Sequence, residues 1–230
     1  MPEGRRLAVV APHPDDESIG AGGLIALWSA AGRDAEVVFL TRGGGGAREL
    51  RDPHRGAPDT AALRASVEDR RQAEAEAALA ILGARALWLD GTDGALHTDE
   101  SRLSAAVRAH WKAAPPDVIA APFPADRHPD HAVAARIVAA AAPRTSAIYA
   151  YEVWSPCVAN VALDIAPVAD RKARAIAAHA SQVATTDYGA AVAGLNLYRG
   201  ITAGLGARPA EAFWQTTPAD YGALAATLEV

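Results

Sequence analysis

Short apolar runs alternate along the chain with longer segments that carry small and apolar residues at helical spacing. An apolar run bounded by polar turns is typical of a buried strand, and an apolar stripe with a period near 3.6 residues is typical of a helix. Strands are predicted over residues 7–10, 35–41, 87–89, 118–121 and 161–165. Helices are predicted over residues 20–31, 61–82, 101–113, 131–142 and 167–182.

This alternation predicts an α/β fold, namely a Rossmann-like three-layer sandwich with a mostly parallel sheet. Residues 1–150 carry the alternation and form the expected Rossmann-like core. The pattern weakens afterwards, so residues 151–230 are expected to form a C-terminal extension that packs near the pocket. Neither an internal repeat nor a linker is visible, which favours a single domain over residues 1–230. Segment 42–60 contains four consecutive glycines but no Gly-Lys-Ser/Thr, and we expect a flexible loop beside the pocket rather than a phosphate-binding loop.

The composition narrows the classes of protein further. Half of the 230 residues are hydrophobic, which is typical of a globular chain long enough for one full core. The net charge of −5, without a basic run, argues against a nucleic-acid partner. The N-terminal apolar run is too short for a signal peptide, and no stretch reaches the roughly 18 residues of a membrane span, so the cytoplasm is the expected location. A single cysteine, Cys157, excludes an internal disulfide and a cysteine metal cage.

The stretch His13-Pro14-Asp15-Asp16-Glu17 directly follows the first predicted strand. Open α/β sheets bind ligands beyond the carboxyl ends of their strands. Two adjacent carboxylates repel each other there unless a cation or a proton offsets them, and a divalent metal is the simplest offset. His13 and Asp16 could supply a nitrogen and an oxygen to one ion, which leaves Asp15 to handle protons. The alternative is that Asp15 and Asp16 only cap the following helix.

A second polar turn, from Asp126 to His131, follows the predicted strand 118–121 and precedes an Ala-rich helix. His128 and His131 are three residues apart, so they can lie on one side of a turn that opens a helix. A lone histidine is more often a structural residue than a ligand. Two in one strand-end turn, matched by His-x-x-Asp in another, favour a shared metal site. Asp130, between the two histidines, is expected to orient an imidazole rather than to ligate the metal.

The two turns together resemble the signatures of the LmbE-like, or PIG-L, N-deacetylases. These are zinc-dependent hydrolases that usually remove an acetyl group from an N-acetylglucosamine-type amino sugar. Their His-Pro-Asp-Asp-Glu and His-x-Asp-His signatures stand here without a substitution. The resemblance implies that His13, Asp16 and His131 hold the metal. It also implies that Asp15 is the general base and that His128 is the partner that stabilises or protonates.

Such a ligand set fits hydrolytic chemistry. Two imidazoles and one carboxylate leave Zn²⁺ with open positions for water and substrate, and Fe²⁺ or Co²⁺ would suit the same ligands. The site would keep about one positive charge, which would polarise an amide carbonyl and lower the pKa of bound water. Asp15 would take a proton from that water, and a protonated His128 would add a second positive partner. Either residue could then deliver a proton to the leaving amine.

Two further residues match weaker patterns of the family and are candidates for binding a small-molecule amino-sugar substrate. Arg71 stands in an Arg-x-x-Glu pattern whose arginine contacts the sugar in some members, and Asp93 resembles an acid that binds sugar hydroxyls. Each has an ordinary alternative, a solvated ion pair for Arg71 and a turn residue for Asp93. Where some relatives carry a tyrosine that supports the oxyanion, this chain has Asp126, which would move that task to His128.

The sequence therefore predicts a cytoplasmic, zinc-dependent N-deacetylase of a GlcNAc-type amino sugar. Two alternatives stay open: an amidase that cleaves a thiol–sugar conjugate, and a non-catalytic Rossmann-like binder of a sugar or a nucleotide. A binder would not need Asp15 beside intact metal ligands. Tyr151, Trp154 and Trp214 are equally consistent with the core and with a platform for sugar stacking.

Overall fold

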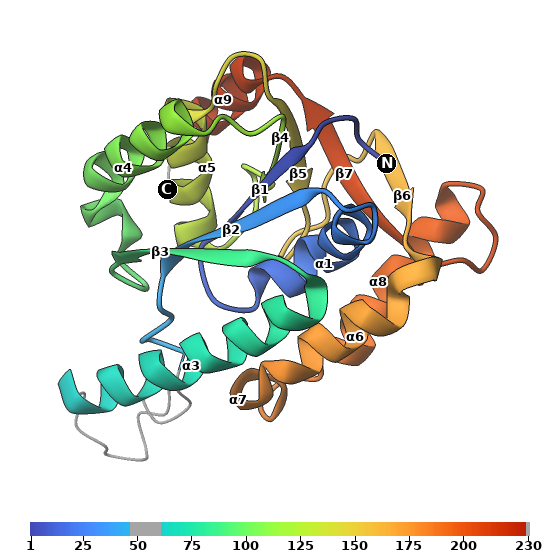
Figure 1. Ribbon diagram of the computed structural model, residues 1–230, viewed down its shortest axis with the longest axis horizontal. Helices are drawn as coiled ribbons and strands as arrows, with labels where there is room; N and C mark the ends of the chain where they lie inside the picture. The colour runs from blue at the N-terminus through green and yellow to red at the C-terminus, as the bar shows by residue number, and fades with distance from the viewer. Residues whose placement is uncertain (47–60, 229–230) are drawn as a thin grey trace.

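A computed structural model describes residues 1–46 and 61–228 of the protein. Within these residues the strands form one seven-stranded sheet with the order β3-β2-β1-β4-β5-β7-β6 (Figure 1). Strands β1 to β5 pair in parallel, whereas β7 runs antiparallel to both β5 and β6. This mostly parallel α/β sheet confirms the predicted fold class. The strands are β1 (Arg6–Ala11), β2 (Asp34–Thr41), β3 (Arg85–Gly91), β4 (Val118–Pro122), β5 (Ala147–Tyr151), β6 (Val161–Asp164) and β7 (Ala210–Thr216).

Helices cover both faces of this sheet (Figure 1). Helices α1, α3 and α6 pack on one face with Leu7 and Val9 of β1, and α4, α5 and α9 pack on the other face with Ala8 and Val10. A strand buried on both faces needs a continuous apolar run, which is why the sequence of β1 is not alternating. The helices are α1 (Asp16–Ala30), α3 (Ala61–Leu82), α4 (Glu100–Ala113), α5 (Pro129–Ala141), α6 (Ala169–Ala178), α7 (Ala180–Val183), α8 (Tyr188–Thr202) and α9 (Pro218–Thr227).

Several element predictions need correction. The helix expected from residue 20 begins at Asp16, so the acidic motif itself forms its first turn. The single helix expected over 167–182 is divided into α6 and α7 at His179, whose backbone leaves the helical region with φ −77° and ψ 56°. The residues from 188 onward, for which the sequence predicts no element, contain α8, β7 and α9. Of the expected loop 42–60, the part after residue 46 lies outside the described residues.

No helix in the described ranges, 1–46 and 61–228, combines the length and the apolar content needed to cross a membrane.

The sheet topology explains why the two sequence motifs meet. Strand β1 pairs with β2 on one side and with β4 on the other, so the order of the strands reverses between β1 and β4. Because β1 and β4 are parallel neighbours, their carboxyl ends lie at the same edge of the sheet. The turn after β1 carries the first motif and the turn after β4 carries the second. Ligands of open α/β sheets bind at such a reversal point.

Candidate metal centre and active site

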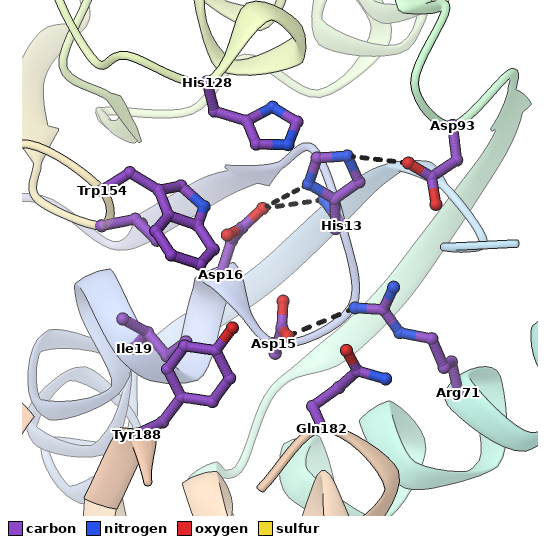
Figure 2. A pocket seen from close by; sticks show the side chains of 11 residues that line it. His13, Asp15, Asp16, Ile19, Arg71, Asp93, His128, Trp154, Gln182 and Tyr188 are labelled. Atoms are coloured by element: carbon purple, nitrogen blue, oxygen red, sulfur yellow. Dashed lines mark hydrogen bonds and ion pairs between the residues drawn. The ribbon is translucent and has the colours of Figure 1, made fainter. Parts of the chain in front are cut away.

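The turn after β1 directs its two aspartates differently. Asp15 precedes the first residue of α1, yet among the described residues its side chain makes no capping hydrogen bond. Its carboxylate instead pairs with Arg71, whose Nη2 lies 3.2 Å from Oδ2 of Asp15. Asp16 begins the helix, and its Oδ2 accepts a hydrogen bond of 2.9 Å from the backbone N–H of His13. Figure 2 shows Asp15 directed toward Arg71, whereas Asp16 is directed toward His13.

The carboxylate of Asp16 joins imidazoles from both motifs. Its Oδ2 lies 3.2 Å from Nδ1 of His13 and 3.2 Å from Nε2 of His131. The ring centroids of His13 and His131 are 5.6 Å apart, and the ring of His128 lies 4.9 Å from each of them. The structure therefore brings His13, Asp16 and His131 around one point, and His128 stands beside them.

Further carboxylates contact the nitrogens of His13 and His131 that do not face Asp16. Nε2 of His13 lies 3.1 Å from Oδ2 of Asp130 and 3.2 Å from Oδ1 of Asp93. Nδ1 of His131 lies 3.6 Å from Oδ1 of Asp126. Carboxylates in such positions fix the orientation and the tautomer of a ligating imidazole, with the other nitrogen left for a metal. Asp130 is buried and also accepts backbone N–H groups, as expected for an orienting residue, although the imidazole that it contacts belongs to the other motif.

These donor groups fit a divalent metal ion. Nitrogen atoms of His13, His128 and His131 lie within 4.8 Å of one another, close enough for one ion. The ring of His131 is fully buried, and neither of its nitrogens has a hydrogen bond of good geometry to any described group. Buried polar atoms rarely lack a hydrogen-bond partner. Oδ2 of Asp16 lies 3.2 Å from Nε2 of His131, but this ion-pair contact does not have the geometry of a hydrogen bond. A cation between the imidazoles and Asp16 would satisfy both partners.

Burial and charge shift the pKa values of the metal-free groups. Burial raises the pKa of Asp15 to about 6, although the charge of Arg71 opposes this rise. The pKa of Asp16 is held well below its usual range because the imidazoles of His131 and His13 outweigh its burial. Burial, together with the neighbouring His13 and His131, lowers the pKa of His128. The two adjacent aspartates therefore differ in proton affinity, as a base and a ligand should.

The two candidates for substrate binding line the pocket, but they also hold the site together. Arg71 is buried and donates hydrogen bonds to the carbonyl oxygens of Gly43 (3.0 Å) and Pro14 (2.5 Å). Gly43 has φ +73°, and a Cβ there would come within 2.4 Å of the guanidinium. Asp93 accepts a hydrogen bond of 2.7 Å from Gly45 N–H with the oxygen that does not face His13. The solvated alternative for Arg71 is wrong, because the side chain is 3% exposed.

The wall of the pocket also includes residues outside the two motifs. Trp154, Gln182 and Tyr188 line it together with His13, Asp15 and their neighbours (Figure 2). Trp154 is 37% exposed and packs edge-to-face on Tyr188, with ring centroids 6.1 Å apart. The sequence from residue 188 onward has no clear period, so a contribution of Tyr188 to the pocket could not be inferred from it.

The other two aromatic candidates belong to the core. Tyr151 is fully buried and its hydroxyl donates to the carbonyl oxygen of Val10. Trp214 is partly buried, packs against the core and stacks on the buried Tyr221.

Asp126 connects the turn that carries His128 and His131 with the segment that carries Trp154. Its Oδ1 accepts the backbone N–H of His128, and its Oδ2 accepts the backbone N–H groups of Trp154 and Ser155. Sequence reasoning treated Asp126 only as a departure from a tyrosine. Since an acidic side chain beside two histidines is a common orienting group, the residue types alone could have indicated this role.

Fold and site together define a Rossmann-like α/β protein with a candidate His–Asp metal centre at the carboxyl edge of its sheet. The model of the PIG-L family, described as GlcNAc-PI de-N-acetylase, matches residues 8–142, which include both motifs. The chain belongs to this family.

Curated relatives match a shorter stretch. A 1D-myo-inositol 2-acetamido-2-deoxy-alpha-D-glucopyranoside deacetylase from Nocardioides is 41% identical over 83 residues, which are 34% of this chain and 25% of the relative. For a relative of the same description from Mycobacterium avium, the identity is 54% over 43 residues and 14% of its length. The chain therefore matches a quarter or less of the length of these relatives.

Solved structures match almost the whole chain. An N,N'-diacetylchitobiose deacetylase from Pyrococcus horikoshii is similar with a TM-score of 0.75 and 22% identity, over 94% of this chain and 85% of that one. GalB, the 4-carboxy-2-hydroxymuconate hydratase from Pseudomonas putida, is similar with a TM-score of 0.75 and 27% identity, over 94% and 97%. Both share the fold, although their names describe different reactions. The fold alone therefore does not define the reaction, which depends on the groups in the site.

Proposed function

We propose that the protein is a metal-dependent hydrolase that removes the acetyl group from the N-acetyl amide of a small-molecule amino sugar. One observation carries this proposal: Asp15 stands beside the metal donors without being one of them. Oδ2 of Asp16 faces the two imidazoles, whereas the carboxylate of Asp15 faces Arg71 and the pocket. A hydrolase needs both a metal site and a separate base, and a binding protein needs no base.

His13, Asp16 and His131 would hold the ion, and their two imidazoles and one carboxylate favour Zn²⁺, with Fe²⁺ or Co²⁺ as close alternatives. A bound divalent ion would polarise the amide carbonyl and increase the acidity of water at the site. The proposed ligands need no rearrangement across the chain, because both turns already meet at one edge of the sheet.

Asp15 is the proposed general base. Its carboxylate is buried, and Arg71 holds one of its oxygens from the side. Among the described residues, Arg71 also donates to the carbonyl oxygens of Gly43 and Pro14, which fix the position of the guanidinium beside the Asp15 carboxylate. A general base must be held within reach of the proton that it accepts, and this arrangement holds the carboxylate in place.

His128 is proposed to donate a hydrogen bond to the amide oxygen as negative charge develops there. Its Nδ1 accepts the backbone N–H of Asp130 at 3.2 Å, so the proton of the neutral ring is on Nε2. This refines the expectation of a positively charged His128, since burial and two neighbouring imidazoles lower its pKa. The neutral ring remains a donor, and donors aimed at a developing oxyanion are effective in a buried site.

The substrate class rests on the pocket and on the names of relatives. Polar groups of Arg71, Asp93 and Gln182 lie on its wall together with the aromatic rings of Trp154 and Tyr188. Sugars present hydroxyl groups at their edges and C–H groups on their faces, so this mixture suits a sugar ring. The deacetylases from Nocardioides and Pyrococcus horikoshii are named for N-acetylated sugars.

The test is an acetate-release assay of the metal-loaded protein with a panel of N-acetylated amino sugars, including thiol–sugar conjugates. We expect turnover with at least one of them. The matched control is Asp15→Asn, which should reduce kcat by at least about 100-fold while the metal stays bound. Loss of the metal in this variant would make Asp15 a ligand and refute its role as base.

The same assay separates the rival reactions. Addition of water to an unsaturated acid, as in the name of GalB, releases no acetate. Hydrolysis of a conjugate at another amide would release its acid instead of acetate. Binding of a sugar by the wild-type protein without release of any product would favour the non-catalytic binder.

A further inference from the structure

We propose that Glu17, Ser18 and His179, here called the Glu17 cluster, are positioning residues that keep the Asp15 carboxylate out of the cap of α1 and directed into the pocket. This inference rests on the proposed function only in so far as Asp15 is the base. None of the three residues lines the described pocket, so they act through Asp15.

The backbone of Asp15 is in a conformation that L-residues rarely adopt. Its φ is 134° and its ψ is −29°, and Asp90 is the other described non-glycine residue with positive φ. A residue persists in such a conformation only when its surroundings hold it there. Asp15 is also at the position where an aspartate side chain normally accepts an N–H of the first helical turn, and it makes no such bond to the described chain.

Glu17 supplies the side-chain contact to the backbone N–H of Asp15, whose carbonyl oxygen accepts the N–H groups of Ser18 and Ile19. Oε2 of Glu17 accepts the backbone N–H of Asp15 at 3.0 Å. In a reciprocal cap, the glutamate near the start of the helix binds the N–H of the capping residue while the capping side chain binds an N–H of the helix. Here only the glutamate half is present. The Asp15 carboxylate is therefore available for the pocket.

The second oxygen of Glu17 is held by two groups. The hydroxyl of Ser18 donates to Oε1 at 2.6 Å, and Nε2 of His179 lies 2.9 Å from the same oxygen. Nε2 of His179 also lies 3.2 Å from the Ser18 hydroxyl. Glu17 and Ser18 are fully buried and His179 is 1% exposed. A buried carboxylate needs such partners, and together they fix the direction of Oε2, the oxygen that accepts the Asp15 N–H.

The break between α6 and α7 positions the imidazole of His179 in the Glu17 cluster. His179 lies at the break, 162 residues after Glu17 in the chain, and its ring reaches the first turn of α1. In a continuous helix over 167–182, residue 179 would have helical backbone angles. The observed non-helical angles of His179 accompany the contact of its imidazole with Glu17 and Ser18. The C-terminal part of the chain thereby fixes the geometry of the base from the N-terminal motif.

The decisive variant is Glu17→Met, which keeps the length of the side chain and removes both acceptors. We expect φ of Asp15 to become negative and its carboxylate to accept an N–H of the first turn of α1. In the metal-loaded protein, kcat should fall by at least about 100-fold, while KM and the metal content per chain stay within about threefold. Glu17→Gln, which keeps one oxygen for the Asp15 N–H, should restore most of kcat.

Glu211 of strand β7 offers a matched control that contacts the same helix. Glu211 is equally buried and accepts the backbone N–H groups of Gly23 (2.6 Å) and Leu24 (2.8 Å) of α1. Glu211→Met should destabilise α1 but leave kcat within about threefold of the wild type. An equal loss of kcat in both methionine variants would mean that general damage to α1 explains the effect, and it would overturn the proposal.

A crystal structure of Glu17→Met gives the readout that does not depend on activity. An Asp15 that keeps positive φ and its contact with Arg71 would refute the proposal, whatever the kinetics. If Glu17→Met does not fold, His179→Gln replaces it, with the same backbone change and loss of kcat expected. If the wild type releases acetate from no sugar, the proposed function fails, while the conformation of Asp15 in these variants still decides the present inference.

Discussion

The buried pair of Lys172 and Glu211 offers a quantitative test of how α1 is held. Nζ of Lys172 lies 2.6 Å from Oε1 of Glu211 and also donates to the carbonyl oxygen of Ile19 at 2.8 Å. The two side chains are 3% and 2% exposed. Lys172→Met would leave the Glu211 carboxylate buried with backbone N–H groups as its partners among the described residues. Removal of one partner of a buried pair costs about 3–5 kcal/mol in the free energy of unfolding.

The double variant should cost less than the sum of the single ones. In Glu211→Met, the ammonium of Lys172 loses its counter-charge, and Gly23 and Leu24 lose their acceptor. When both are methionine, no uncompensated charge is left in the interior, and Ile19 and Gly23 keep their i, i+4 positions within α1. Replacement of a buried ion pair by apolar residues is often neutral. We expect an interaction energy of at least about 2 kcal/mol.

Urea unfolding followed by circular dichroism, together with thermal scans, would measure these differences. For a chain of this size, about 1 kcal/mol corresponds to 2–4 °C in Tm, so each single variant should melt about 10 °C below the wild type. A loss of less than about 1 kcal/mol in Lys172→Met would refute the reasoning, as would strictly additive single and double variants, because the pair would then not be coupled in the interior.

Three further predictions concern the site and its surroundings. His131→Gln should weaken Zn²⁺ binding by more than about 100-fold, because loss of a residue that only orients a ligand costs about 10- to 100-fold. A metal content close to that of the wild type would show that His131 is not a ligand. Trp154→Ala should raise KM for an amino sugar by about 2- to 12-fold with kcat little changed, and Trp154→Phe should restore it; an unchanged KM would exclude stacking. Burial and the nearby Glu152 raise the pKa of the Cys157 thiol to about 12, so a disulfide reagent should react slowly until denaturant is added, and fast labelling of the folded protein would contradict its burial.

The repeated strand–helix pattern was sufficient to predict the layers and the parallel core. Strands such as β1 are buried on both faces and therefore continuous in apolar residues, which is a signal local to the chain. After residue 151 the pattern still predicted a strand at 161–165, which corresponds to β6, but it predicted no element after residue 182, where α8, β7 and α9 lie. Strand β7 pairs antiparallel with both β5 and β6, so its place in the sheet depends on partners distant in sequence, which no single segment records.

The site divides in the same way. The sequence by itself determined the types and spacing of the donors in the two turns, because His13, Asp16, His128 and His131 lie in short motifs whose chemistry is local. Only the tertiary structure decided that Asp93 contacts His13, that Arg71 fixes Asp15, and that Trp154 and Tyr188 share the pocket wall. These contacts join segments distant in the chain, and their geometry depends on how the layers pack and not on any local preference. The strained backbone of Asp15 is of this kind as well, since Glu17 and the distant His179 hold it only in the folded protein.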